Sequence, residues 1–235
     1  GLDWSFNPTP VVARDDVHGT IIHDPEYAKY ADAHWRELIE RYKPSILWND
    51  IGYPETGDVA NIFADYYNNF PDGVVNNRWE IGKEGSEPRH HDFETPEYKT
   101  MDDIYPEKWE TCRGMGYSFG YNHVEGPEQT IKEDELIHLL IDVTAKNGNL
   151  LLNVGPKADG SIPEIQAQRL RALGAWLETN GEAIFGTRPW DRASGKTAAG
   201  IDVRFTRKGD ALYAILLSRP QGGEVTIEGI TPPED

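Results

Sequence analysis

Helical and strand-like patterns alternate along most of this chain, and this alternation constrains the fold more than any other feature. Residues 24–43 carry aromatic and aliphatic side chains at helical spacing, and Asp24-Pro25 is a typical helix start. An apolar run at 45–50, a second helical pattern at 58–70 and a strand-like segment at 74–79 follow. Such alternation predicts an α/β fold with a mostly parallel sheet.

The alternation continues with a long loop at 80–108, strand-like character at 114–122, a helix from about residue 130, and a buried strand at 149–154. Roughly four βα units are visible, whereas a closed (β/α) barrel needs eight. A half barrel leaves two strand edges open and leaves one face of its sheet bare. We therefore expect an incomplete (β/α) barrel over residues 1–190.

The pattern changes after about Trp190, where Val203 to Arg207 alternate apolar and polar side chains, as a half-exposed antiparallel strand does. Residues 212–217 and 224–228 are further short strand patterns. We interpret residues 191–235 as a short antiparallel β segment, a truncated β-sandwich-like domain.

The charge and composition of the chain limit the classes of partner that it can bind. The chain has 40 acidic and 23 basic residues, a formal net charge of -17. Nucleic acid and anionic membrane surfaces need a basic footprint, so neither is an expected partner. No apolar run is long enough to span a bilayer. A single cysteine, Cys112, excludes an intrachain disulfide.

Sequence motifs for cofactors and metals are missing. The glycines at 114, 116 and 120 form no dinucleotide fingerprint, because no GxGxxG opens a helix there. The adjacent His90 and His91 fit no zinc template, since neighbouring side chains point apart. We therefore expect neither a cofactor nor a metal ion. The sequence does not assign the protein to a cellular compartment.

The run at 45–50 ends on Trp48, Asn49 and Asp50. Polar residues at the carboxyl ends of barrel strands face the active site, so Asp50 is either catalytic or a well-bonded structural acid. Retaining glycoside hydrolysis needs two carboxyls about 5 to 5.5 Å apart, and Asp50 suits the nucleophile. The second carboxyl stays open at this point, and the candidates in nearby loops are Glu87, Asp92, Glu94, Glu97, Glu110 and Glu125.

Aromatic side chains stand near several predicted strand ends, namely at Trp48, Trp79, Trp109 and Phe119. Two interpretations are equally open. They pack in the core, or they form a platform on which a sugar ring stacks.

Several blocks together carry a family resemblance: residues 42–50, Trp109-Glu110, 118–122, and 149–156 through 159–163. In order and spacing they resemble family 29 glycoside hydrolases, the retaining α-L-fucosidases, from Gly1 to about Trp190. The chain resembles the second, C-terminal half of the TIM-like catalytic barrel of that family.

The resemblance implies a role for each site residue. Asp50 matches the nucleophile, and Glu97, not Glu94, matches the acid/base. Arg78 matches an arginine near the sugar, whose charge favours the ionised form of Asp50. Trp48 matches an aromatic of the sugar pocket, and Phe119 a residue that packs on the fucose methyl group. The implied reaction removes terminal α-L-fucosyl residues from fucosylated oligosaccharides or glycoconjugates by double displacement.

One departure from the family bears on activity. The first barrel strands of these enzymes carry histidines that grip the fucose hydroxyls, and His18, His23 and His34 do not stand in matching motifs. Because half-barrel faces are apolar, we expect a homo-oligomer, a dimer or tetramer, in which copies cover each other. Two alternatives stay open: half of a split enzyme that needs a second chain, and an inactive or sugar-binding fragment.

Overall fold

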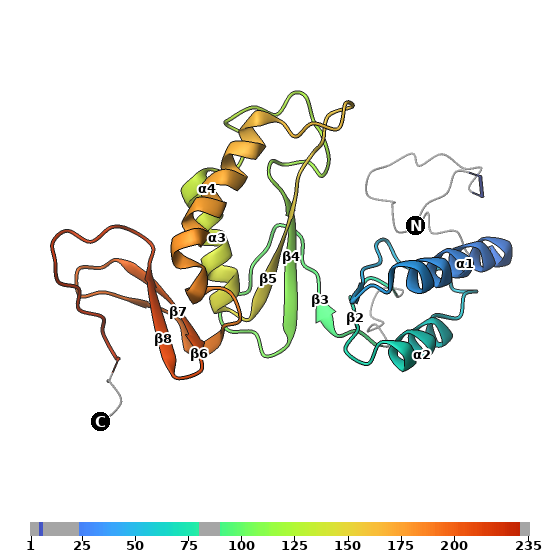
Figure 1. The fold of residues 1–235 in the computed structure, drawn as a ribbon, viewed down its shortest axis with the longest axis horizontal. Coiled ribbons are helices and arrows are strands. Elements are labelled where there is room, and N and C mark those ends of the chain that lie inside the picture. The colour runs from blue at the N-terminus through green and yellow to red at the C-terminus, as the bar shows by residue number, and fades with distance from the viewer. Residues whose placement is uncertain (1–4, 7–23, 80–89, 231–235) are drawn as a thin grey trace. The chain divides into compact units, whose positions relative to one another are not determined.

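The computed structural model describes residues 5–6, 24–79 and 90–230. The chain divides into two compact units, residues Gly1–Thr95 and Pro96–Asp235, which we call the N-terminal unit and the C-terminal unit (Figure 1). Both contain parallel strand pairs and helices, which confirms the predicted α/β class. The predicted boundary near residue 190, between a barrel part and a β segment, stays a prediction.

The described residues of the N-terminal unit form two helices and three short strands. They are α1 (Pro25–Tyr42), β1 (Ile46–Leu47), α2 (Val59–Asn69), β2 (Val74–Val75) and β3 (Phe93–Glu94). Strands β1 and β2 are parallel, and helix α2 makes the crossover between them, as a βαβ unit requires. Asn76 forms a parallel bridge with Phe93, so the strand direction continues into β3.

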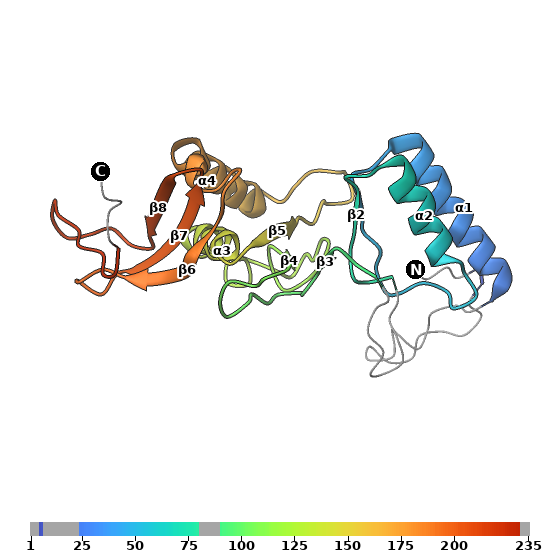
Figure 2. The same cartoon turned by 90° about the horizontal axis from the view of Figure 1, so that it is seen from below.

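Both predicted helices of this unit are confirmed. The side chain of Asp24 accepts the backbone N–H groups of Glu26 and Tyr27, at 2.7 and 3.2 Å, and so caps α1. The Asp58 side chain caps α2 in the same way. The two helices lie side by side (Figures 1 and 2). Their apolar faces bury a core with the strands, formed by Leu47, Tyr53, Val59, Ile62, Phe63, Tyr66, Val75 and Trp79.

The C-terminal unit begins with a longer parallel pair. It contains β4 (Lys108–Gly114), α3 (Glu133–Ala145), β5 (Gly148–Asn153), α4 (Glu164–Asn180) and a 3-10 turn, η3 (Gly181–Ala183). Strands β4 and β5 pair from Trp109 with Gly148 to Gly114 with Asn153. Leu150 and Leu152 of β5 pack on a core with Leu136 of α3. Leu151, between them, points to the opposite face and is 41% exposed.

An antiparallel sheet follows, as predicted. It consists of β6 (Arg188–Lys196), β7 (Asp202–Lys208) and β8 (Ala211–Leu216), in that order. Val203 and Phe205 of β7 are fully buried, and helix α3 contacts both β6 and β7. The short strand expected at 224–228 is a single bridge, between Thr197 and Ile227.

The expected strand at 114–122 is wrong. The strand lies just upstream, in β4, and residues 115–122 form a loop. Close contacts explain the glycines there: a Cβ on Gly114 would lie 2.3 Å from the Ser118 carbonyl oxygen, and one on Gly116 would lie 2.1 Å from a Glu125 carboxylate oxygen. These glycines therefore mark a tightly folded loop rather than a strand.

Within the ranges that the structure describes, no helix is both long and apolar enough to cross a lipid bilayer.

Candidate active site

Two buried asparagines organise the chain directly after β1 and β2. The Asn49 N–H donates to Oδ1 of Asn76, and the Asn76 amide donates to the Asn49 carbonyl, both at 2.9 Å. The Asn49 amide also donates to the carbonyls of Gly52 and Arg78, at 2.9 Å each. Side-chain amides thus replace the backbone ladder here, which is why the strands predicted at 45–50 and 74–79 are only two residues long.

Asp50 follows this scaffold with an accessible carboxylate. Its side chain is 53% exposed, and its Oδ1 accepts Nη1 of Arg78 at 2.8 Å and the Ile51 N–H at 3.0 Å. Ile51 has a φ of 62°, in the left-handed region that a β-branched residue seldom adopts. The backbone directly after Asp50 is therefore strained, and the rest of the unit must hold it there.

Arg78 is the most constrained side chain of this group. Its side chain is only 15% exposed, and its Nε and Nη2 both donate to Thr95, to Oγ1 and to the carbonyl oxygen, at 2.7 Å each. The guanidinium also lies 4.7 Å from the ring centroid of Trp48, in cation–π geometry. The structure thus brings Trp48, Asp50 and Arg78 together, and their roles stay predictions.

Glu97 and Phe119, the other two predicted site residues, belong to the C-terminal unit. Glu97 is exposed and forms a parallel bridge with Cys112 of β4. Tyr98, the next residue, has its ring centroid 5.3 Å from that of Phe119, and its hydroxyl accepts the Gly114 N–H at 3.0 Å. Tyr98 therefore links the segment of Glu97 to the loop of Phe119, a role that the sequence analysis missed.

The Phe119 loop is also fixed at its other end. Gly120 donates its N–H to Oδ1 of Asn153, the last residue of β5, at 3.0 Å. The Phe119 side chain itself is 46% exposed, as a side chain that contacts a ligand must be. The sequence block at 149–156 thus holds this loop as well as forming β5.

Several other candidates have structural roles. Asp92 accepts the Tyr67 hydroxyl at 2.5 Å and the Val75 N–H at 2.8 Å, and Glu125 accepts the Tyr117 N–H at 3.0 Å. Burial and the contact with Asp92 both raise the pKa of Tyr67. Glu87 lies outside the described residues.

The aromatic candidates divide in the same way. Trp79 and Trp109 are almost fully buried, so they serve packing. Trp48 is half-buried beside Arg78, and Phe119 is exposed. Only these last two have surface to offer a sugar.

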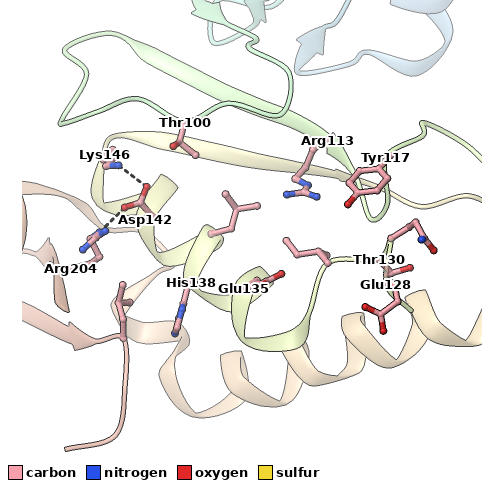
Figure 3. A pocket seen from close by; sticks show the side chains of 14 residues that line it. Thr100, Arg113, Tyr117, Glu128, Thr130, Glu135, His138, Asp142, Lys146 and Arg204 are labelled. Carbon is pink, nitrogen blue, oxygen red and sulfur yellow. Dashed lines mark hydrogen bonds and ion pairs between the residues drawn. The ribbon is translucent and has the colours of Figure 1, made fainter. Parts of the chain in front are cut away.

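A cavity of about 520 Å³ in the C-terminal unit lies elsewhere, along α3 (Figure 3). Three of its charged side chains pair with one another, because Asp142 accepts Lys146 at 2.7 Å and Arg204 at 2.6 Å. None of the predicted site residues lines it.

Comparison with known proteins identifies the family of the chain. The family model described as alpha-L-fucosidase matches residues 3–182. The tissue alpha-L-fucosidase of Macaca fascicularis is 35% identical over 200 residues, which cover 82% of this chain and 42% of that protein. The human tissue enzyme is 34% identical over 200 residues, with the same coverage of 82% and 42%.

Solved structures of alpha-fucosidases are also similar to this chain. The Thermotoga maritima alpha-fucosidase in complex with a mechanism-based inhibitor is 44% identical, with a TM-score of 0.88, over 99% of this chain and 52% of that one. Its complex with fucose gives a TM-score of 0.85 at 44% identity, over 98% and 52%. The chain thus spans about half the length of these relatives. It belongs to the alpha-L-fucosidase family of glycoside hydrolases.

Proposed function

We propose that this chain is a catalytic part of a retaining α-L-fucosidase, which releases terminal α-L-fucosyl residues from fucosylated oligosaccharides or glycoconjugates. The observation that carries the proposal is the exposed Asp50 carboxylate, held by Arg78 at the carboxyl end of a strand, in a chain of the fucosidase family. The T. maritima relative binds fucose, which supports a fucoside as substrate.

The proposed reaction has two steps. Asp50 attacks the anomeric carbon while Glu97 gives its proton to the departing glycosidic oxygen, and a covalent fucosyl–Asp50 ester forms. Glu97 then takes a proton from water, the water attacks the anomeric carbon, and Asp50 leaves as a carboxylate. Two inversions give net retention. This mechanism requires the two carboxyls to stand about 5 to 5.5 Å apart in the working enzyme.

The remaining site residues fit supporting roles. Arg78 balances the negative charge of Asp50, and the half-buried Trp48 gives the sugar an apolar wall. The exposed ring of Phe119, braced by Tyr98, suits packing against the methyl group of fucose.

We further propose that the parallel strands are part of a (β/α) barrel which is completed by another polypeptide. The helices of the C-terminal unit cover one face of β4 and β5, whereas Leu151 on the other face is 41% exposed. In a closed barrel that face would be filled by side chains from the other strands. A second copy of this chain, as a dimer or tetramer, is the proposed cover, and a separate complementary half is the alternative.

The experiment is hydrolysis of an aryl α-L-fucoside by the purified chain and by Asp50→Ala. We expect turnover to fall by several orders of magnitude in the variant, with partial recovery in azide, because azide replaces the missing nucleophile. Asp72→Ala, at an exposed turn of the same unit, is the matched control and should keep its activity. Proton NMR of the first product should show the α anomer.

Each result has a clear meaning. Full activity in Asp50→Ala would remove Asp50 from the mechanism, and a β anomer would exclude retention. A wild-type chain that binds fucose without cleaving the fucoside would favour the sugar-binding alternative.

A further inference from the structure

We propose that Asp50 attacks the sugar through its Oδ2 atom, and that Thr95 is a positioning residue that fixes this choice by holding Arg78. The inference rests on the proposed function, which makes Asp50 the nucleophile. It adds which of the two carboxylate oxygens forms the bond, and which buried residue decides it.

The two oxygens of Asp50 have different surroundings. Oδ1 accepts two hydrogen bonds, from Nη1 of Arg78 at 2.8 Å and from the Ile51 N–H at 3.0 Å. Within the described part of the N-terminal unit, no protein group donates a hydrogen bond to Oδ2. Hydrogen bonds to a charged oxygen stabilise its lone pairs, so the oxygen without donors is the better nucleophile.

The reaction can be written on these atoms. The Oδ2–C1 bond forms as the bond from C1 to the glycosidic oxygen breaks, and the electron pair of that bond leaves with the oxygen, which takes the Glu97 proton. In the ester Oδ1 becomes the carbonyl oxygen. In the second step the electron pair returns to Asp50, and Arg78 and the Ile51 N–H are already placed to stabilise the returning charge.

Ile51 supplies one of these donors because its backbone is left-handed. Its φ is 62°, and the next residue, Gly52, has a φ of 80°. The Gly52 N–H donates to the Arg78 carbonyl at 3.1 Å, which anchors this unusual turn. Strain of this kind persists where the surrounding contacts over-determine the conformation, as they do here.

Thr95 determines the direction of the other donor. The Arg78 guanidinium places Nε and Nη2 on the hydroxyl and carbonyl oxygens of Thr95, at 2.7 Å each, so two bonds fix its plane. With the plane fixed, the directions of the N–H bonds on Nη1 are fixed as well, and Nη1 donates to Oδ1 of Asp50. A planar fork held on one side thus aims its third nitrogen.

The Thr95 hydroxyl is itself oriented. It donates its proton to Oδ1 of Asn77 at 2.7 Å, and the Thr95 N–H donates to the same oxygen at 3.1 Å. Since Nε of arginine can only donate, the hydroxyl must offer it a lone pair, and its proton is free for Asn77. Thr95 is only 5% exposed, so water does not easily replace these bonds.

The kinetic test is Thr95→Val, which keeps the shape but removes the hydroxyl. We expect kcat to fall about 10- to 100-fold with KM within about twofold, because the change misaligns the attacking carboxylate. Thr95→Ser, which retains the hydroxyl, should recover most of kcat. Thr111→Val on β4 is the control, since Thr111 is equally buried, at 1% exposure, and lies outside this network.

Two further measurements test the hold on Arg78 and the identity of the attacking oxygen directly. In ¹⁵N NMR, the Arg78 Nε–H should exchange with water at least about tenfold faster in Thr95→Val than in wild type or Thr95→Ser, because it loses its acceptor. In a crystal of the chain trapped with a 2-fluoro-fucosyl fluoride, the ester should stand on Oδ2, with Arg78 still bonded to Oδ1.

An ester on Oδ1 would overturn the choice of oxygen. Unchanged Nε–H exchange together with unchanged kcat in Thr95→Val would overturn the role of Thr95. A wild-type chain without turnover would instead count against the proposed function, and the exchange measurement would still decide whether Thr95 holds Arg78.

Discussion

A carboxylate that attacks carbon has to be charged and accessible, and these demands conflict, because the contacts that favour the charge also cover the oxygens. Asp50, the proposed nucleophile, keeps its accessibility because Arg78 and the Ile51 N–H both donate to one oxygen and the side chain remains 53% exposed. This arrangement is unfavourable for the two residues that supply the hydrogen bonds. Arg78 is largely buried, and Ile51 adopts a strained backbone.

Glu97 can be tested at the same scale by its dependence on the leaving group. We expect Glu97→Ala to impair natural fucosides, whose leaving groups are poor, far more than activated aryl fucosides, because only the former need a proton on departure. The measurement is kcat/KM on both substrate types, with Glu94→Ala as the matched control. Equal losses on both types, or a leaving-group effect at Glu94, would assign the acid/base elsewhere.

The sequence indicated the candidate site residues, whose roles stay predictions, but not the residues that hold them in place. Asp50 and Arg78 stand at recognisable strand ends, and the structure indeed brings them together. Thr95, Asn77 and Asn49 were missed, because each acts through a partner 17 to 29 positions away. Such pairs carry no local pattern, since they depend on which strand ends meet in the folded unit.

At the scale of elements, helix α2 also ties the N-terminal unit together through a polar contact. Its Tyr67 hydroxyl donates to Oδ2 of Asp92, and the same oxygen accepts the Val75 N–H of β2 at 2.8 Å. The Asp92 N–H donates back to the Val75 carbonyl at 2.9 Å. One acid therefore joins the helix, β2 and the segment that leads into β3.

This contact predicts a loss of stability at alkaline pH. Burial and Asp92 raise the pKa of Tyr67 above its usual 10.0, so the folded state binds the phenolic proton more tightly than the unfolded state does. The contribution to stability is complete below about pH 10 and is lost as pH rises through the folded pKa. Burial raises the pKa of Tyr53 and Tyr66 in the same direction.

Urea unfolding followed by near-UV circular dichroism between pH 8 and about 11 measures this loss. The midpoint should fall above about pH 10, and less steeply in Tyr67→Phe, which has no proton to lose. Tyr42→Phe is the control, because Tyr42 is 70% exposed. Equal slopes in Tyr67→Phe and Tyr42→Phe would contradict the assignment.

Helices that begin at a recognisable capping residue were predictable from the sequence, whereas a strand with an interrupted apolar–polar alternation was not. Helices α1 and α2 begin at capping aspartates visible in the sequence. Strand β6 was missed, because its Pro189 and the bulge before Ser194 break the alternation that signals a strand.

At the scale of the whole molecule, the exposed apolar side chain of Leu151 on β5 predicts association. We expect the purified chain to exceed its monomer mass of 26.5 kDa in light scattering, because the proposed oligomer covers Leu151 with another copy. Leu151→Arg should shift the population toward the monomer, since it places a charge in the contact. Leu170→Arg, at a 38% exposed site on α4, should leave the mass unchanged.

A monodisperse wild-type monomer with full fucosidase activity would contradict association of this kind. Aggregation that a complementary polypeptide relieves would favour the split-enzyme alternative.

The stacking of Arg78 on Trp48 has a practical consequence. An indole that lies 4.7 Å from a guanidinium feels the field of that cation, and its emission wavelength depends on it. Any ligand that moves the Arg78 guanidinium changes the emission wavelength and intensity of Trp48 fluorescence. The chain therefore carries an intrinsic optical reporter beside Arg78, and the difference between wild type and Trp48→Phe isolates that signal from the other six tryptophans among the 7 in the sequence.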